Sequence, residues 1–154
     1  MLNPDYHDIL SAFNAQGVEY LVVGAYALAA HGVPRATGDI DLWIRTSVVN
    51  ADRVWRALGH FGAPLGQLSR DELAVPGTVF QIGLPPRRID LHTTIDGVEF
   101  DEAWPERLQL QVEGVPLPVI GRAHLIANKR ASARPQDLAD VQRLTGEGSD
   151  SARP

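Results

Sequence analysis

Two aspartates stand two residues apart in the segment Asp39-Ile40-Asp41, and a third, Asp90, lies within the segment 88–92 (Arg-Ile-Asp-Leu-His). Both segments alternate polar and apolar residues, which predicts strands whose alternate side chains share a face. If these strands are neighbours, the three carboxylates converge. Carboxylates that would otherwise repel each other can share divalent cations, and three of them can hold two ions beside a triphosphate. The pattern therefore predicts a two-ion site for Mg²⁺, with Mn²⁺ as the alternative cation.

The same aspartates also have a purely structural interpretation. The chain contains 12 aspartates, so chance alone gives about one Asp-x-Asp. A pair of aspartates on a solvated strand edge needs no ligand. Asp90, which follows Arg87 and Arg88, can form a surface ion pair of small energetic value. The metal-site hypothesis therefore depends on the context of the three aspartates.

A glycine turn precedes the aspartates. Gly24 joins an apolar segment, 18–23, to an alanine-rich segment, 25–30. A strand–Gly–helix turn leaves backbone N–H groups unpaired at the helix start, where an anion can bind. Arg35 and Thr37, in the following loop, can add a positive charge and a hydroxyl donor for the same anion. The alternative is a tight turn that needs glycine for packing, followed by ordinary loop residues.

One lysine stands out in the C-terminal part. Lys129 is the only lysine among 14 basic residues, and it lies in a stretch, 121–145, with five basic and two acidic side chains, although the whole chain has a formal charge of −5. An ammonium group binds phosphate as a compact charge that a guanidinium does not reproduce. A codon bias toward arginine explains the ratio equally well. The basic stretch can serve a triphosphate or guide an RNA end.

The hydrophobic pattern predicts the elements that must position these residues. It indicates one α+β (α/β-type) domain over 1–145, with a small mixed sheet flanked by helices. Helices are expected at 4–16, 25–30, 52–61, 121–131 and 135–144, with one helical turn at 70–73. Strands are expected at 18–23, 39–45, 78–82, 88–93, 108–113 and 116–120, the last at a sheet edge because of its prolines. The polar residues 146–154 are expected to be a disordered tail.

Composition excludes several classes of protein. The longest apolar runs fall short of the roughly 18 residues that a membrane helix needs, and the N-terminal residues lack the order of a signal peptide. The absence of cysteine excludes a disulfide framework, a thiolate metal site and a cysteine nucleophile. We therefore expect a cytoplasmic protein without a membrane partner.

Taken together, three motifs resemble the nucleotidyltransferase fold of the DNA polymerase β-like superfamily: Val23-Gly24-Ala25, Asp39-Ile40-Asp41 and 88–91 (Arg-Ile-Asp-Leu). The segments 25–41 and 125–144 are similar to those of small stand-alone members and of AbiEii-type toxins of abortive-infection toxin–antitoxin systems. The second segment carries a helical lysine and an Arg-x-x-Asp-x-x-Asp run. The resemblance spans residues 18–145. It implies transfer of an NMP from an NTP to a hydroxyl acceptor, with release of pyrophosphate.

The resemblance also implies a role for each motif. Asp39 and Asp41 would ligate both metal ions, and Asp90 would complete the acceptor-side ion site and help to take the acceptor proton. The implied nucleotide-binding residues are Gly24, Ala25, Arg35, Thr37 and Lys129, and the supporting residues are Asp137, Asp140 and His92. Ala25 departs from the family, which has a second Gly or Ser there, so the hydroxyl is lost while the N–H remains. His31 is a further candidate, and for both histidines a structural role is the alternative.

Two other functions remain open. One is a non-catalytic nucleotide- or partner-binding module on the same fold, against which the three intact carboxylates argue. The other is a metal-dependent glycosyltransferase that uses Asp-x-Asp, for which the chain leaves little room for an acceptor domain. The acceptor itself is open between RNA, a protein hydroxyl and a small molecule. A cognate antitoxin or toxin partner follows only from the resemblance.

Overall fold

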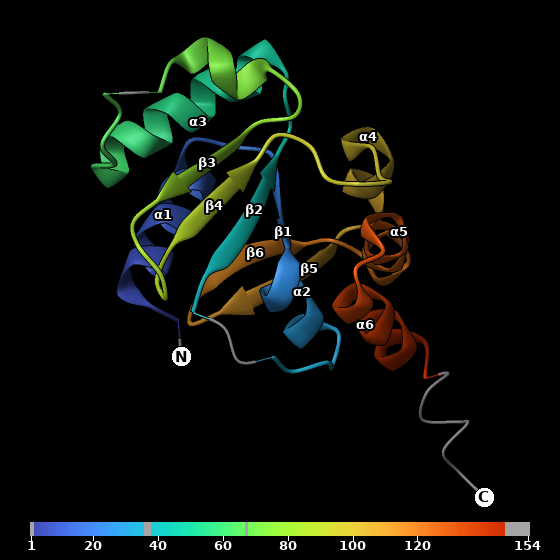
Figure 1. Ribbon diagram of the computed structural model, residues 1–154. Coiled ribbons are helices and arrows are strands. Elements are labelled where there is room, and N and C mark those ends of the chain that lie inside the picture. Colours follow the sequence, from blue (N-terminus) through green and yellow to red (C-terminus); the bar gives the residue numbers. More distant parts are fainter. Residues whose placement is uncertain (1, 36–37, 67, 147–154) are drawn as a thin grey trace, which may run out of the picture.

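The computed structural model describes residues 2–35, 38–66 and 68–146 (Figure 1). Its strands are β1 (Tyr20–Val23), β2 (Ile40–Ile44), β3 (Val79–Ile82), β4 (Ile89–His92), β5 (Leu108–Val112) and β6 (Val115–Val119). Its α-helices are α1 (Pro4–Ala15), α2 (Gly24–Ala30), α3 (Val48–Phe61), α4 (Phe100–Ala103), α5 (Arg122–Ser132) and α6 (Pro135–Thr145). Two 3₁₀ turns, η1 (Arg70–Ala74) and η2 (Trp104–Glu106), complete the described elements.

The strands form one mixed sheet in the order β3-β4-β2-β1-β6-β5. β2 runs antiparallel to β1 and parallel to β4, and both edge strands run antiparallel to their neighbours. In the view of Figure 1, α1 and α3 lie to the left of the central strands, and α4, α5 and α6 lie to the right. The predicted α+β class and mixed sheet are therefore confirmed.

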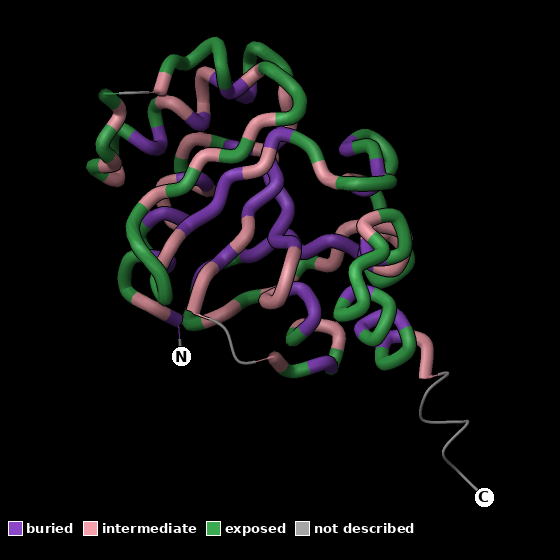
Figure 2. The backbone as a smooth tube through the Cα atoms, in the orientation of Figure 1, coloured by how far each residue is buried: buried purple, intermediate pink, exposed green. Residues whose placement is uncertain are grey.

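The core explains why these segments fold as they do. In α1 the buried residues Tyr6, Ile9, Leu10 and Phe13 follow helical spacing. Asn3 caps this helix by accepting a hydrogen bond from the Asp5 N–H at 2.8 Å. On β2, Ile40, Leu42 and Ile44 share one face and are at most 1% exposed, and Trp43 on the other face is 2% exposed. Figure 2 shows the buried positions concentrated on the central strands.

The expectation that 116–120 is an edge strand is wrong, because β6 lies between β1 and β5. The carbonyl of Pro116 accepts a hydrogen bond from Asn14 Nδ2 at 2.9 Å, so this side of β6 faces α1 rather than β5. Pro118 points to the same side, since alternate residues of a strand do. Ile120, next on that side, donates its N–H to the Val22 carbonyl at 3.1 Å. β6 therefore joins β1 only beyond its prolines, where an N–H is present to donate.

Other differences concern element ends. α3 begins at Val48, four residues before the predicted start, because Ser47 caps it by accepting a hydrogen bond from the Asn50 N–H. The short helix α4 is absent from the prediction, since one helical turn carries too few residues to show a period. None of the described helices is long and apolar enough to cross a membrane. Of the predicted tail 146–154, the structure describes only Gly146, which ends α6 at a φ of 76°; the remainder lies outside the described residues.

Candidate active site

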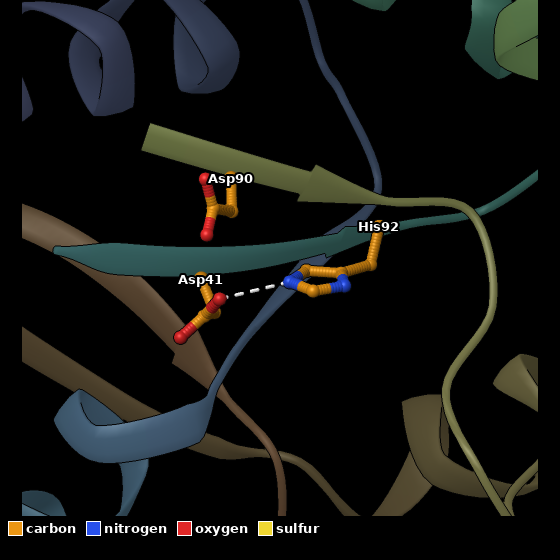
Figure 3. A group of neighbouring side chains, drawn as sticks. All are labelled: Asp41, Asp90 and His92. Atoms are coloured by element: carbon orange, nitrogen blue, oxygen red, sulfur yellow. Dashed lines mark hydrogen bonds and ion pairs between the residues drawn. The ribbon is translucent and has the colours of Figure 1, made fainter. Parts of the chain in front are cut away.

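The parallel pairing of β2 with β4 places Asp41 directly opposite Asp90. His92 follows on the same face of β4, diagonal to Asp41. One ligand atom from each of these three side chains lies within 4.8 Å of the other two, and the His92 Nε2 is 2.8 Å from the Asp41 Oδ1. Figure 3 shows the three side chains gathered beside the two strands. We refer to Asp41, Asp90 and His92 as the Asp–Asp–His cluster.

The cluster borders a cavity of about 310 Å³. Asp90 is buried at 7% exposure, whereas the side chains of Asp41 and His92 are about one quarter exposed and line the cavity. The rest of the lining comes from the β1–α2 turn, the segment after β4, and the α5–α6 region: Val23, Gly24, Thr94, Ile95, Asp96, Asn128, Lys129, Ser132, Arg134 and Asp137. The cavity thus has the Asp41 carboxylate at the sheet, and Lys129 and Arg134 beside Asp137 on the helix side.

Gly24 is required by its surroundings as well as by its backbone. Its φ is +66°, a value that residues with side chains rarely adopt. A Cβ at this position would lie 2.3 Å from the Asp41 Oδ2. The turn and the carboxylate therefore share a space that only glycine leaves open. Ala25 is the second residue of α2, and its side chain is not part of the cavity lining.

Asp39 does not join the Asp–Asp–His cluster. It precedes β2, and its Oδ1 accepts a hydrogen bond from the Arg88 backbone N–H at 3.0 Å. The Arg88 guanidinium lies between two carboxylates: Nη2 is 3.7 Å from the Asp39 Oδ2, and Nε is 2.7 Å from the Asp90 Oδ1. The hydrogen bond to Asp90 raises the pKa of Arg88, and the charges of Asp90 and Asp39 act in the same direction. The ion pair named as the alternative for Asp90 is therefore formed, although Asp90 also belongs to the cluster.

Tyr6 joins the segments that lead into the two aspartate motifs. Its hydroxyl hydrogen-bonds to the carbonyl oxygens of Gly38 and Arg88, which precede Asp39 and Ile89. Burial raises the pKa of Tyr6, and the nearby Tyr26 and carboxylates raise it further, so the phenol remains a donor at neutral pH. A core residue of α1 thereby holds the starts of β2 and β4 side by side.

A second group of charges lies on α5 and α6. Lys129 is buried at 7% exposure, and its Nζ is 3.4 Å from the Asp137 Oδ1 and 3.3 Å from the Asp140 Oδ2. Both aspartates are at most 1% exposed. Arg35 donates to Asp140, which connects the loop before the aspartate motif to α6. The predicted supporting residues Asp137 and Asp140 thus hold Lys129 and Arg35 in place, while Thr37 lies outside the described residues.

Asp137 receives the most hydrogen bonds in this group. The Ser132 hydroxyl donates to its Oδ2 at 2.8 Å, and the Arg134 Nε donates to the same oxygen at 2.7 Å. Burial by itself would raise the pKa of Asp137, but these hydrogen bonds and the charges of Lys129 and Arg134 outweigh it, so the pKa lies well below its usual range. Asp137 is therefore a carboxylate at any physiological pH.

Some cavity residues carry no recognisable sequence signal. Thr94, Ile95 and Asp96 follow β4 in a segment without periodicity, and only the fold brings them to the cavity. Asn128 fixes this segment by donating from Nδ2 to the Asp96 carbonyl at 2.9 Å. Arg134 had a signal, since it opens the Arg-x-x-Asp-x-x-Asp run. His31 lies elsewhere, with Nε2 2.8 Å from the Ile120 carbonyl oxygen, which is a structural contact.

The sequence matches no family model and no curated protein sequence. Among solved structures, a protein from Thermotoga maritima assigned as a nucleotidyltransferase matches with a TM-score of 0.59 at 15% identity, over 97% of this chain and 96% of that chain. The chain has the nucleotidyltransferase fold. The lincosamide antibiotic adenylyltransferase LnuA, with lincomycin bound, matches with a TM-score of 0.58 at 12% identity, over 94% of this chain and 97% of that chain. ANT(2")-Ia in complex with adenylyl-2"-tobramycin matches with a TM-score of 0.55 at 15% identity, over 94% of this chain and 88% of that chain.

The nucleotidyltransferase fold confirms the resemblance at the level of fold, whereas the likeness to AbiEii-type toxins stays a prediction. Within this fold, the Asp–Asp–His cluster suits a divalent cation. Carboxylate oxygens and imidazole nitrogen are both ordinary ligands for such ions. Gly24 keeps the space beside the Asp41 Oδ2 free of a side chain. The residues present therefore fit a bound metal ion.

Proposed function

We propose that this chain is a metal-dependent nucleotidyltransferase that moves an NMP from an NTP to a hydroxyl acceptor and releases pyrophosphate. The observation that carries the proposal is the pairing of Asp41 with Asp90 across parallel strands, with Asp41 lining a cavity that Lys129 and Arg134 also line. This arrangement suits a metal–triphosphate complex, because the carboxylates can take the cation and the donors that the basic side chains keep can face the phosphates. The nucleotidyltransferase fold supports the same reading.

The basic side chains keep donors for phosphate. Arg134 uses Nε and Nη2 on Asp137, while its side chain remains 75% exposed, and a guanidinium has five N–H donors. Lys129 has three donors and two carboxylate neighbours. We assign the phosphates to these groups and to the backbone at Gly24 and Ala25. Arg35 and Thr37 remain predicted contacts at the loop side.

The reaction is an in-line substitution at the α-phosphorus. The acceptor oxygen forms a bond to this phosphorus, the bond to the bridging oxygen of the β-phosphate breaks, and pyrophosphate carries away the electron pair. Asp41 and Asp90 would hold the divalent cation, Mg²⁺ in the sequence-based expectation, and when bound it would neutralise charge on the attacking and leaving oxygens. Asp41 and Asp90 would thereby also orient the triphosphate. Asp90 is the candidate group to take the proton from the acceptor hydroxyl. Asp39, a ligand by the sequence resemblance, would join Asp41 and Asp90 only if the Arg88 guanidinium moved away from it. Catalysis is then mainly positioning and electrostatics.

A small hydroxylated molecule is the acceptor that the comparisons favour. LnuA is described as a lincosamide antibiotic adenylyltransferase, and ANT(2")-Ia was solved with an adenylylated tobramycin. We therefore rank a small molecule ahead of RNA or a protein hydroxyl. A toxin–antitoxin partnership rests on the sequence resemblance alone.

One observation favours a second candidate, the non-catalytic binding module. Arg88 engages Asp39 and Asp90 together, and a guanidinium held there permanently would occupy the place of a cation. In that case the chain would bind a nucleotide through its basic wall without transferring it. The two candidates differ in whether a metal ion can displace Arg88.

Two experiments test the proposal. Calorimetric titration with each NTP and Mg²⁺ is expected to show binding that Asp41→Asn and Asp90→Asn weaken, while the charge-matched control Asp101→Asn, on the exposed surface at α4, leaves it unchanged. Transfer of label from NTP is then followed on small hydroxylated compounds, total RNA and protein lysate. Label on any acceptor class that requires Asp41 supports the enzyme. NTP binding with no label on any of them identifies the binding module.

A further inference from the structure

The third member of the Asp–Asp–His cluster is an imidazole, where a site built for Mg²⁺ alone would need only oxygens. Asp41 and Asp90 supply the carboxylates and His92 supplies the imidazole, and one ligand atom from each lies within 4.8 Å of the other two. Asp39 is not among the residues whose ligand atoms meet at this point, and Arg88 contacts both Asp39 and Asp90. The side chains that meet at this point therefore form a mixed oxygen and nitrogen set.

The spacing of the three ligand atoms suits one metal ion. A first-row divalent ion with ligands at about 2.1 Å holds adjacent ligand atoms roughly 3 Å apart and opposite ones about 4.2 Å apart. The Nε2 of His92 lies 2.8 Å from the Asp41 Oδ1, close to the adjacent spacing. The His92 imidazole points toward the Asp41 carboxylate, with which it would share the ion (Figure 3). For all three atoms to reach one ion, Asp90 would have to turn an oxygen away from Arg88, whose Nε and Nη2 donate to its two oxygens at 2.7 and 3.1 Å.

The position of His92 is fixed by the sheet. It is the last residue of β4, where Trp43 of β2 is its register partner. Its side chain is about one quarter exposed at the cavity. A rigid strand position with an open side toward the cavity is what a metal ligand requires, because the ion must enter while the ligand stays in place.

Ligand type decides which ion such a site prefers. Mg²⁺ binds oxygen and gives up water reluctantly, so a nitrogen ligand adds little to its affinity. First-row transition-metal ions accept imidazole readily, and their affinity for mixed sites rises from Mn²⁺ toward the later metals. An imidazole among the ligands therefore raises the affinity for transition-metal ions more than the affinity for Mg²⁺.

We propose that His92 is a metal ligand and that the Asp–Asp–His cluster takes a first-row transition-metal ion, with Mn²⁺ the first to test, in preference to Mg²⁺. The inference rests on the proposed function, because it assigns the cation of that same site. It assigns His92 a direct bond to the ion, which differs from a role in orienting Asp41 through their hydrogen bond.

The test is pulsed electron paramagnetic resonance of the full chain loaded with Mn²⁺. A histidine ligand gives ¹⁴N modulation of the Mn²⁺ signal, which the wild type is expected to show and His92→Gln to lose. His60→Gln, at the exposed end of α3, is the matched control and is expected to retain it. Calorimetry should show Mn²⁺ bound at least tenfold more tightly than Mg²⁺, with His92→Gln weakening Mn²⁺ by at least tenfold and Mg²⁺ by much less.

The outcomes separate this inference from the proposed function. Metal binding that needs Asp41 and Asp90, but shows no nitrogen modulation or is unaffected by His92→Gln, overturns the role of His92 and leaves the nucleotidyltransferase proposal standing. Absence of any Mn²⁺ or Mg²⁺ binding to the wild type, with NTP present, overturns both. A His92→Asp variant, which replaces the imidazole nitrogen with a carboxylate oxygen, should reduce the difference between the Mn²⁺ and Mg²⁺ affinities. An unchanged difference would contradict the inference. Thermal melting of each variant confirms that it is folded.

Discussion

Gly24 and Asp41 occupy adjoining space so closely that a Cβ on residue 24 would lie 2.3 Å from the Asp41 Oδ2. The turn after β1 and the carboxylate on β2 are therefore fitted to each other. In the proposed enzyme, the phosphates and the cation must also lie at this point. A change at the glycine consequently affects the fold and the metal site together.

We expect Gly24→Ala to weaken metal binding by at least tenfold, because the new methyl group displaces the Asp41 carboxylate from its place. The positive φ adds a backbone cost of about 1–2 kcal/mol. Gly114→Ala is a matched control, since Gly114 has a φ of +79° and a Cβ added there would meet no atom within 4 Å. Calorimetry and chemical unfolding on both variants should show similar destabilisation but a loss of metal binding only for Gly24→Ala. Equal metal affinities would contradict the proposed fit.

Arg88→Gln should make the stability of the protein depend on metal. The substitution removes the cation between Asp39 and Asp90, and leaving the buried Asp90 without it should lower the free energy of unfolding. A divalent cation can then supply the missing charge, so the melting temperature should rise more with added Mg²⁺ or Mn²⁺ than in the wild type. Arg87→Gln, at an exposed position, should behave as wild type. A metal response identical in all three proteins would show that the guanidinium and the ion do not compete.

Lys129→Met is expected to destabilise the protein by about 3–5 kcal/mol, the usual cost of removing one partner from a buried ion pair. Two buried carboxylates, Asp137 and Asp140, would lose their shared ammonium group. The exposed neighbour Arg130 provides the control Arg130→Met, for which we expect a change below about 0.5 kcal/mol. Urea unfolding monitored by circular dichroism measures both. Similar values for the two variants would mean that the network does not hold α5 and α6 together.

Asp137 should make unfolding sensitive to acid. Its pKa is lowered in the folded protein, so it contributes stability that is fully present above the unfolded pKa of about 3.9 and is lost as the pH falls through the folded value. Urea unfolding between pH 7 and pH 2 should show a steeper fall below pH 4 for wild type than for Asp137→Asn. The variant should also be less stable at pH 7. Parallel curves would contradict the assignment.

The aspartate pairing shows what the sequence could predict. Alternation of apolar and polar residues was enough to locate both strands and to place Ile40, Leu42 and Ile44 in the core, because a period of two is a local property. That Asp41 and Asp90 would be neighbours was a hypothesis, and the parallel register confirms it. The order of strands in a sheet is set by tertiary packing, so only the structure could decide it.

The behaviour of Asp39 could not be read in the same way. It stands two residues before Asp41, and sequence spacing alone puts both on one face. The structure begins β2 at Ile40 and pairs Asp39 with Arg88 of the neighbouring segment, a contact with no local signal. The prediction that β6 is an edge strand was wrong for a related reason. The sequence does not reveal which side of a strand faces a neighbouring strand, so the prolines of β6 did not decide its place in the sheet.

The hydrogen bond from Arg35 to Asp140 joins residues that are 105 positions apart. While the chain is being synthesised, the loop that precedes the aspartate motif therefore gains this contact only after α6 has been made. Lys129 likewise waits for Asp137 and Asp140. The sheet and its carboxylates can form first, but the basic wall of the cavity is assembled only with the last helix described. In the proposed enzyme, nucleotide binding through these basic groups would therefore require α6 to be in place.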